Sequence, residues 1–246
     1  MTARRDGART GAAAVLLEGV TQRFGTLDVL EDVSLGVAPG EVVAVVGPSG
    51  CGKSSLLDVV CGLAAPAGGT VTSEPAVLMP QRDALLPWLT ALDNAALPLR
   101  IAGTPKDEAR AAARPKLDAL GLGGFHDARP HELSGGMRQR VAFVRTLLAG
   151  LPVLCLDEPF GALDAITRAE AQTWLAAALD SEPRAVLLVT HDVEEELVLA
   201  DRLVVLSPRP GRVVADLDVD LPRPRHRTDP ALVALRDRAL QELGAA

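Results

Sequence analysis

The chain has 246 residues, 48% of them hydrophobic, and its formal net charge is -7. This length accommodates one large α/β domain with an inserted subdomain. The negative charge disfavours non-specific binding to nucleic acid and electrostatic adhesion to anionic lipid, which both need a basic surface. No apolar run approaches the roughly 18 to 20 residues that cross a bilayer. Residues 1–13 contain arginines but no signal-peptide core, so we expect them to be disordered.

The first part of the chain predicts antiparallel strands that lead into a parallel sheet. From Val15 through the run VSLGV, short strand-like segments are separated by Gly25 and Gly40, which predicts β-hairpins that turn at these glycines. The following run, Val42–Val46, is wholly apolar. Such a run is typical of a strand that is buried on both faces.

The pattern becomes helical between about residues 80 and 150. Thr104 and Pro105 predict a helix start, and Gly121 predicts a helix end. Pro115 lies between them and should kink or split that helix, because proline cannot donate the backbone hydrogen bond.

Apolar strand-like runs return after the helical stretch, at residues 153–156, 186–189 and 203–206. Because helices separate these runs, they predict further strands of one mainly parallel sheet. A last helix with an apolar stripe begins at residues 229–230. We therefore expect a domain over residues 14–225, a helical subdomain inserted at about residues 82–149, and a C-terminal helix within residues 226–246.

The segment GPSGCGKS matches the phosphate-binding pattern G-x-x-x-x-G-K-[ST] in full, between a predicted strand and an apolar helix. Glycines let backbone N–H groups wrap phosphate oxygens, and the helix N-terminus adds partial positive charge. Lys53 can supply a charge to the β- and γ-phosphates, and the Ser54 hydroxyl can bind Mg²⁺. The predicted nucleotide-binding residues here are Gly47, Pro48, Ser49, Gly50, Cys51, Gly52, Lys53, Ser54 and Ser55.

Two later strands end in residues that suit phosphoryl transfer. Asp157 and Glu158 follow the run VLCL, and the C-terminal tip of a strand is where a nucleotide's metal should lie. We expect Asp157 to hold Mg²⁺, directly or through water, and Glu158 to act as general base toward the attacking water. The run VLLVT ends at His191, which can donate to a γ-phosphate if its strand joins the same sheet.

The segment LSGGMRQR, at residues 133–140, resembles the signature motif of ABC ATPases. Other motifs of that family appear in the expected order, and the resemblance covers about residues 15–222. It implies the ABC ATPase fold: a P-loop NTPase core of the α/β class, with helices on both faces of a mainly parallel sheet, an N-terminal antiparallel β region and an inserted α-helical subdomain. It also implies that the nucleotide is ATP and that the metal is Mg²⁺.

The resemblance implies further site residues. Phe24 resembles the aromatic residue that stacks on adenine. Gln81 resembles the glutamine that senses Mg²⁺ and the attacking water, and His191 resembles the switch histidine. Asp164, in GALD, resembles the aspartate of the D-loop.

The signature residues Ser134, Gly135 and Gly136 open a predicted helix, and so they offer backbone N–H groups and a hydroxyl to an anion. In the family, this motif completes the ATP site of a second copy and not its own site. The resemblance thus implies a head-to-tail homodimer with two ATP molecules between the subunits, which opens after hydrolysis. Ser55 replaces a common threonine conservatively, so both sites are expected to be active.

The stretches LLPWLTALDN and PFGALDAITR and the tail SPRPGRVVADLDVDLPRPR resemble the importer branch for nitrate, sulfonate and taurine-type solutes. This implies a peripheral ATPase subunit on the cytoplasmic face of a bacterial membrane, bound to a separate permease and served by a periplasmic or lipid-anchored solute-binding protein. Nitrate, alkanesulfonate, taurine and thiamine-precursor pyrimidines all stay open as the solute. The alternatives are an exporter ATPase and a soluble ABC ATPase that acts on nucleic acid, which the acidic composition disfavours.

Leu85, Leu86 and Trp88 are unusual in a predicted loop, because only 2% of the chain is aromatic. They follow Gln81 closely, at the start of the helical stretch. We expect them to line part of a groove for a short permease helix, so that the segment joins ATP chemistry to transport. The alternative is that Trp88 packs inward beneath the helical subdomain.

Three weaker patterns favour structural roles. The cysteines lack the spacing of metal ligands and predict reduced thiols; they are Cys51, Cys61 and Cys155. Alternating aspartates over residues 216–220 predict a half-solvated strand in preference to a metal site. The run PRPRHR, at residues 222–227, predicts an exposed linker in preference to an anion or lipid-headgroup site.

Overall fold

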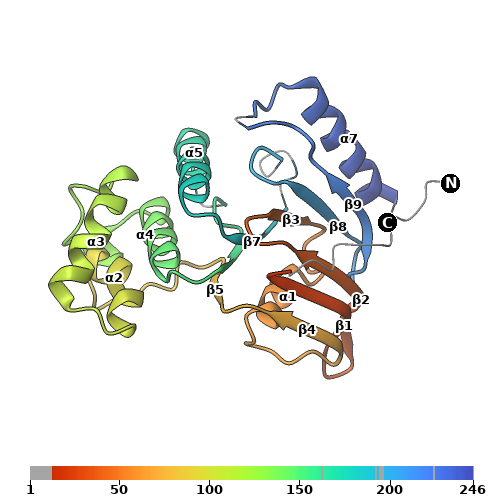
Figure 1. Ribbon diagram of the computed structural model, residues 1–246, viewed down its shortest axis with the longest axis horizontal. Coiled ribbons are helices and arrows are strands. Elements are labelled where there is room, and N and C mark those ends of the chain that lie inside the picture. The colour runs from red at the N-terminus through yellow and green to blue at the C-terminus, as the bar shows by residue number, and fades with distance from the viewer. Residues whose placement is uncertain (1–12, 162, 192, 194–196, 224, 246) are drawn as a thin grey trace.

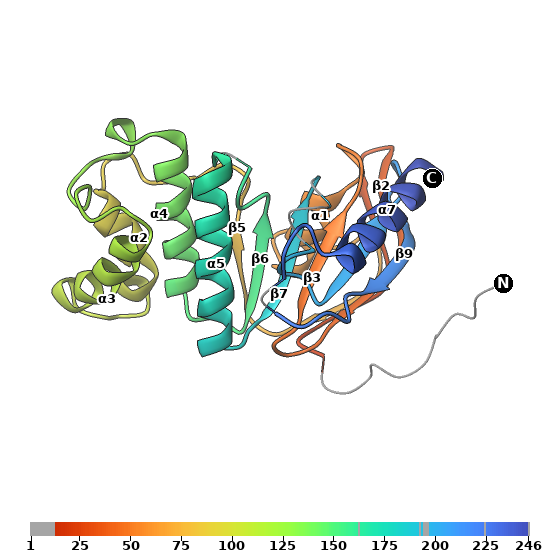
Figure 2. The ribbon, with the colours of Figure 1, turned by 90° about the horizontal axis from the view of Figure 1, so that it is seen from above.

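The computed structural model describes residues 13–245 except 162, 192, 194–196 and 224. The disorder predicted for residues 1–13 therefore lies outside the described residues at all but the last position. A sheet-centred body stands beside a lobe of helices, as Figures 1 and 2 show. Within the described ranges, no helix is both long and apolar enough to cross a membrane.

The central sheet has six strands in the order β5-β6-β7-β3-β8-β9. Neighbouring strands are parallel except for β9, which is antiparallel to β8. Every residue of β3, β6, β7 and β8 is buried, as expected for parallel strands that are covered on both faces. The predicted mainly parallel sheet is confirmed. Its strands are β5 (Ala76–Met79), β6 (Val153–Asp157), β7 (Ala185–Thr190), β3 (Val42–Val46), β8 (Arg202–Leu206) and β9 (Val213–Asp218).

A smaller antiparallel sheet has the order β2-β1-β4. Its strands are β1 (Val15–Phe24), β2 (Leu27–Val37) and β4 (Gly68–Ser73). The hairpin predicted at Gly25 joins β1 to β2. The hairpin predicted at Gly40 is wrong, because the chain leaves this sheet there and β3 pairs in parallel with β7 and β8. A strand that is buried along its whole length needs cover on both faces, which only the central sheet provides.

Alternate residues of β3 face two hydrophobic clusters. Val43 and Val45 join a cluster with α1 and the small antiparallel sheet. Ala44 and Val46 join the other cluster, with α5, α7 and the helical subdomain. Figure 1 shows α5 and α7 on the opposite side of β3 from α1, so the predicted core with helices on both faces is confirmed. These helices are α1 (Lys53–Val60), α5 (Ala165–Ser181) and α7 (Pro230–Ala245).

Helices inserted between β5 and β6 form the lobe that lies farthest from α7 in Figure 2. They are α2 (Ala91–Ile101), α3 (Lys106–Ala119), the 3₁₀ helix η1 (Pro130–Glu132) and α4 (Gly135–Leu148). The split predicted as one outcome at Pro115 does not occur, because α3 is one helix that contains this proline. Its buried face of Ala109, Ala113 and Leu117 lies on both sides of the proline and holds the two halves in one packing arrangement.

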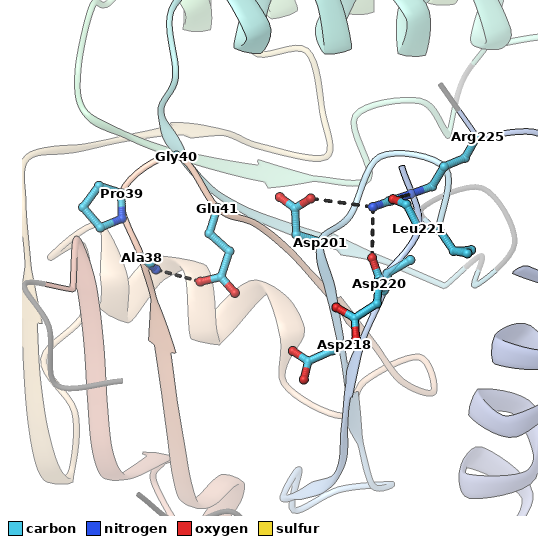
Figure 3. A pocket seen from close by; sticks show the side chains of 10 residues that line it. Ala38, Pro39, Gly40, Glu41, Asp201, Asp218, Asp220, Leu221 and Arg225 are labelled. Atoms are coloured by element: carbon cyan, nitrogen blue, oxygen red, sulfur yellow. Dashed lines mark hydrogen bonds and ion pairs between the residues drawn. The ribbon is translucent and has the colours of Figure 1, made fainter. Parts of the chain in front are cut away.

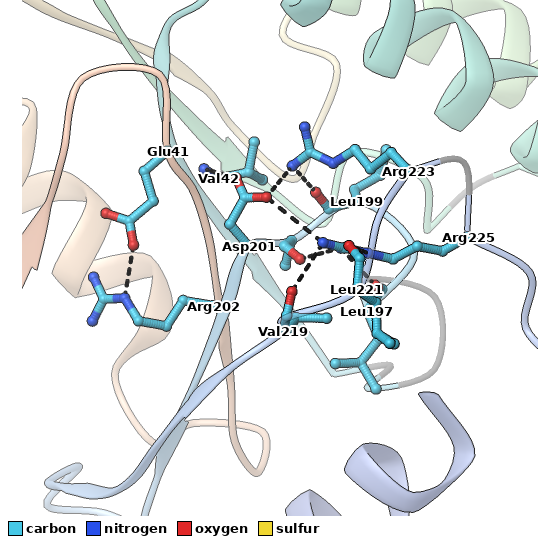
Figure 4. A network of polar contacts seen from close by, with 11 residues as sticks. Glu41, Val42, Leu197, Leu199, Asp201, Arg202, Val219, Leu221, Arg223 and Arg225 are labelled. Carbon is cyan, nitrogen blue, oxygen red and sulfur yellow. Dashed lines mark hydrogen bonds and ion pairs between the residues drawn. The ribbon is translucent and has the colours of Figure 1, made fainter. Parts of the chain in front are cut away.

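Two arginines of the run PRPRHR bond to other parts of the fold, so the prediction of an exposed linker is wrong. Arg223 donates to the Asp201 carboxylate at 2.7 Å. The Arg225 side chain is buried, and burial lowers its pKa. Its guanidinium donates to four backbone oxygens, which compensates for the burial of its charge. These belong to Leu197, Val219 and Leu221, which Figure 4 labels, and to Ala200.

A pocket of about 700 Å³ lies where β3 and β8 begin, at the opposite end of these strands from the glycine-rich loop. The side chains of Glu41, Asp201 and Arg225 line it (Figure 3). The exposed Asp218 and Asp220 lie at its edge and alternate with buried neighbours, as predicted for a half-solvated strand.

Candidate active site

The glycine-rich loop is built by backbone conformations that exclude side chains at two positions. A Cβ at Gly47 would lie 2.8 Å from Cys51 Sγ and 3.1 Å from Leu206 O. Gly52 has φ of 110°, and a Cβ there would lie 2.6 Å from Leu30 Cδ2. Glycine is therefore required where the chain passes from β3 into α1. This frees the backbone N–H groups of the loop to face an anion.

Lys53 folds back over this loop. Its Nζ donates to Gly47 O at 2.6 Å and to Pro48 O at 3.1 Å, and the side chain is buried. The ammonium thus lies at the start of α1, where its charge adds to the positive end of the helix dipole. Together they form a site for a polyphosphate.

Ser54 and Asp157 meet across the site from different elements. The Ser54 hydroxyl, in α1, donates a hydrogen bond to the Asp157 carboxylate at the end of β6. Burial is the largest cause that raises the pKa of Asp157, and the charge of Glu158 raises it further. A buried carboxylate beside a hydroxyl is an oxygen donor set that suits Mg²⁺, and a cation would relieve the cost of its burial. The two residues therefore fit the predicted metal site.

Glu158 lies at the centre of a hydrogen-bonded cluster. Its Oε2 accepts from Gln81 Nε2 at 2.8 Å, and its Oε1 lies 2.9 Å from His191 Nδ1. Burial raises the pKa of Glu158, but the hydrogen bonds from His191 and Gln81, with the charges of His191 and Lys53, outweigh this and leave the pKa below its ordinary value. The carboxylate stays ionised at neutral pH, which a general base requires.

The backbone conformation also orients Glu158, and the sequence did not indicate this conformation. Its φ is 47°, in the left-handed region that non-glycine residues rarely occupy, and its N–H donates to Val189 O at 2.9 Å. Gln139 Nε2 in α4 donates to the Glu158 carbonyl at 3.0 Å. Gln139 is a buried residue of the signature segment, and the helical periodicity of α4 alone could not identify this partner.

The segment after Gln81 is attached to α4. Arg138 Nε donates to Asp83 Oδ2 at 2.9 Å, and Arg145 donates to the backbone oxygens of Asp83 and Ala84 at 2.8 Å each. Gln81 therefore contacts the candidate base, Glu158, and the residues that follow Gln81 contact α4, the helix that begins in the signature motif. Neither contact was predictable from local pattern.

Asn94 holds the next loop in place. Its Oδ1 accepts from Leu86 N at 2.8 Å, and its Nδ2 donates to the oxygens of Leu86, Leu89 and Thr90 at 3.0–3.3 Å. The side chain of Asn94 is fully buried. The sequence offered one signal for this role, which is the presence of a polar residue among apolar residues at the start of a helix.

The apolar residues of this loop divide between the interior and the surface. Leu85 is buried and Leu86 is half-buried, whereas Trp88 is 68% exposed. The alternative that Trp88 packs inward is therefore wrong, because the Asn94 hydrogen bonds hold the loop with its indole outward. The predicted loop at these residues is confirmed, since α2 begins only at Ala91.

The signature residues lie apart from the glycine-rich loop of the same chain. Ser134 caps α4 by accepting from Met137 N at 3.2 Å, and Ser134 and Gly135 are exposed. Figure 2 shows α4 and α1 separated by β5 and β6. The exposed start of α4 is therefore free for a ligand that its own loop does not hold.

Two remaining candidates lie on the surface. Phe24 ends β1 and is 54% exposed, so its ring can stack on a planar ligand. Asp164 caps α5, accepting from the backbone N–H groups of Ile166 and Thr167 at 3.1 Å each. These bonds, with that from the Thr167 hydroxyl, lower the pKa of Asp164. Part of the GALD motif, residue 162, lies outside the described residues.

A phosphate loop between a parallel strand and a helix, with an acidic pair at the tip of another parallel strand of the same sheet, defines a P-loop nucleotide hydrolase. The family model described as ABC transporter matches residues 30–161. The chain therefore belongs to the ABC transporter family, and it is an ATPase of transport. The predicted family, fold and ATPase class are confirmed.

The similarity to individual relatives supports the assignment to this family. The chain is 45% identical over 241 residues to the aliphatic sulfonates import ATP-binding protein SsuB 1 of Rhodococcus jostii (strain RHA1), covering 95% of each chain. It is 45% identical over 210 residues to the taurine import ATP-binding protein TauB of Burkholderia pseudomallei (strain 1710b), covering 82% of this chain and 81% of that protein. It also matches the ATP-binding cassette MJ0796, a dimeric structure of a post-hydrolysis state bound to ADP and Pi, with a TM-score of 0.77 and 29% identity, covering 84% of this chain and 99% of that chain.

Proposed function

We propose that the protein is the ATP-hydrolysing subunit of a bacterial ABC importer for a small sulfonate- or taurine-type solute. It acts as a homodimer on the cytoplasmic face of the membrane, bound to a separate permease. The observation that carries the chemistry is the ionised Glu158, held by Gln81 and His191. The importer assignment is supported by two relatives whose names contain aliphatic sulfonates import and taurine import. Nitrate and thiamine-precursor pyrimidines stay open as solutes.

The proposed hydrolysis begins with ATP phosphates bound by the loop N–H groups and Lys53. Ser54, Asp157 and Gln81 would hold Mg²⁺, and a bound ion would neutralise charge on the transferred phosphoryl group. Glu158 accepts a proton from the attacking water, because its lowered pKa keeps it ionised. His191, which is 62% exposed at its side chain, donates to the γ-phosphate.

The proposed dimer completes each site with residues of the second copy. Ser134, Gly135 and Gly136 contribute an exposed helix start with unsatisfied N–H groups, which suits a γ-phosphate. Phe24 stacks on adenine, and Asp164 lies at the subunit boundary. The support is the exposure of Phe24, Ser134, Gly135 and Asp164, the separation of α4 from α1, and the dimeric state of the related cassette.

The proposed permease contact lies on the loop that carries Leu86 and Trp88. An exposed indole on a rigid loop provides the apolar anchor that a short helix can bind. Asp83 links this loop to α4 through Arg138, while Gln81 contacts Glu158. Binding or loss of a γ-phosphate can therefore shift the contact surface. A solute-binding protein takes part only through the permease.

The test is recovery of the tagged, full-length protein from detergent-solubilised membranes of the cells that produce it. We expect a multispanning permease to be recovered with the wild type and to be strongly depleted with Trp88→Ala, while the ATPase rate of the soluble variant is unchanged. Recovery of nucleic acid without a permease would overturn the assignment. Equal recovery of the permease by both proteins would place the contact elsewhere.

A further inference from the structure

The turn between β8 and β9 lies against the glycine-rich loop. This turn is the segment SPRPGR, residues 207–212, which begins the tail that resembles importer ATPases. Gly211 in this turn is buried, and a Cβ at this position would overlap with the carbonyl oxygen of Cys51. Since Cys51 belongs to the glycine-rich loop, the two backbones approach each other where no side chain fits.

The turn is also bonded to β2. Gly211 N donates to Val29 O at 2.8 Å, and Glu31 N donates to Gly211 O at 3.0 Å. These two bonds flank a parallel bridge between Leu30 and Gly211. They connect the small antiparallel sheet to the central sheet, and they fix Gly211 relative to β2.

Leu30 packs against both the turn and the glycine-rich loop. Its side chain is fully buried. A Cβ at Gly211 would lie 3.3 Å from Leu30 Cδ2, and a Cβ at Gly52 would lie 2.6 Å from the same atom. Because a close-packed interior transmits small displacements, a change at Gly211 reaches the loop through this side chain as well as through Cys51.

The turn is held more firmly than the loop. Ser207 N donates to Arg212 O at 2.9 Å, and Arg212 N donates to Ser207 Oγ at 3.0 Å, so Ser207 closes the turn. Ser49 and Gly50 of the loop are exposed. An atom added between the turn and the loop should therefore displace the loop.

We propose that Gly211 is a positioning residue for nucleotide binding, because its lack of a side chain lets the turn set the orientation of the Cys51–Gly52 peptide. A trans peptide is planar, and its N–H points opposite to its carbonyl oxygen. The Cys51 oxygen lies at the turn, so the Gly52 N–H points away from it. This inference rests on the proposed binding of phosphates by the N–H groups of the loop.

The test is isothermal titration calorimetry of the full-length protein with Mg·ADP, below the unfolding temperature of every variant. ADP binding requires no hydrolysis and no γ-phosphate. We expect Gly211→Ala to weaken ADP binding at least about tenfold, because the added methyl group turns the Cys51–Gly52 peptide out of place. ADP affinity equal to that of the wild type would overturn the proposal.

Two control variants should bind ADP as the wild type does. In Gly36→Ala, on β2, the added Cβ would come no closer than 3.8 Å to Leu16 Cδ1 and Val15 O. Arg212→Ala, in the same turn, removes an exposed ion pair of 2.6 Å with Glu31 but leaves Gly211 in place. A loss of affinity in Gly36→Ala as large as in Gly211→Ala would overturn the proposal, because it would show a general effect of added volume.

Steady-state ATPase rates separate positioning from loss of stability. Partial unfolding lowers the active fraction and hence the apparent kcat, whereas a misplaced loop raises KM for ATP. We expect Gly211→Ala to raise KM more than it lowers kcat, and the reverse would contradict positioning. If Gly211→Ala does not fold, Ser207→Ala loosens the turn without adding atoms and should weaken ADP binding about twofold to tenfold. Unchanged affinity in Ser207→Ala would then overturn the proposal, whereas a wild type that binds no ADP would refute the phosphate site itself.

Discussion

Gln81 Nε2 donates a hydrogen bond of 2.8 Å to Glu158 Oε2, across 77 positions of the chain. The residues after Gln81 are bonded in turn to α4 through Asp83 and Arg138. The candidate base, the signature helix and the exposed loop of Trp88 are thus connected by hydrogen bonds and not merely near one another. This gives each part of the proposed mechanism a residue that can be changed separately.

We expect Glu158→Gln to bind ATP but to lose about 10²- to 10⁴-fold in turnover, the usual contribution of a general base. Glutamine keeps the shape of the side chain but cannot accept the proton. Phosphate release measures turnover, and size-exclusion chromatography with saturating Mg·ATP should show a stable dimer. Normal turnover would exclude the general-base role, and a variant that stays monomeric would count against the proposed sandwich.

Completion of the site in trans can be tested by mixing two inactive variants. Lys53→Ala removes the ammonium from the loop and should weaken ATP binding at least about tenfold, or about 1.4 kcal/mol. Ser134→Arg should block the exposed start of α4 without changing the loop. A mixture should regain part of the ATPase activity, because one of the two sites in each heterodimer is intact. A mixture as inactive as its components would argue that each chain completes its own site.

Asp157→Asn should stabilise the nucleotide-free protein at neutral pH. The pKa of Asp157 is raised in the folded state, mainly by burial, so the folded protein binds this proton more tightly than the unfolded chain. Stability therefore falls as pH rises from the ordinary aspartate pKa through the raised one. We expect a higher Tm for the variant, and loss of the extra stabilisation that Mg²⁺ adds to ATP. A lower Tm without ligands would contradict the burial argument.

The contribution of Glu158 to stability should depend on pH with the opposite sign to that of Asp157. Its pKa is lowered in the folded state, so its ionised form contributes stability that is present above the ordinary glutamate pKa and is lost as pH falls through the folded value. We expect Glu158→Gln to lower the Tm at neutral pH and the difference from the wild type to shrink in acid. Denaturation at several pH values measures this, and a difference that grows in acid would refute it.

Asn94→Ala should cost at least about 2 kcal/mol of unfolding free energy, because it leaves buried backbone groups of the loop without partners. The matched control is Trp88→Ala, on the same loop, whose side chain is 68% exposed and whose loss should cost no more than about 0.5 kcal/mol. Urea denaturation of both variants checks this. Equal costs would show that the indole, and not Asn94, holds the loop.

Much of the site was predictable because its functional residues lie in short contiguous segments of the chain. The phosphate loop is one contiguous segment, and Asp157 and Glu158 directly follow an apolar run. Parallel strands bring their C-terminal ends to one edge, so His191 could be placed near them from the strand pattern alone. Burial on both faces gave β3 its continuous apolar character, which allowed the parallel sheet to be predicted.

Other features depended on contacts between distant segments. The turn at Gly40 looks the same whether or not the chain changes sheets, so the local pattern wrongly predicted a hairpin. The arginines near residue 225 look solvated by composition, yet Arg225 is buried and donates to the Leu197 carbonyl, 28 positions away in the chain.

By itself, the sequence determined the class of chemistry, because phosphate binding needs particular residue types at particular spacings along one segment. Its hydrophobic periodicity also distinguished the strands from the helices. Only the tertiary structure decided which distant groups meet Glu158, that Trp88 faces solvent, and how the loop after Gln81 is anchored. The reason is physical: local periodicity reports which face of an element is buried, whereas the partners of a polar side chain are set by how the elements pack.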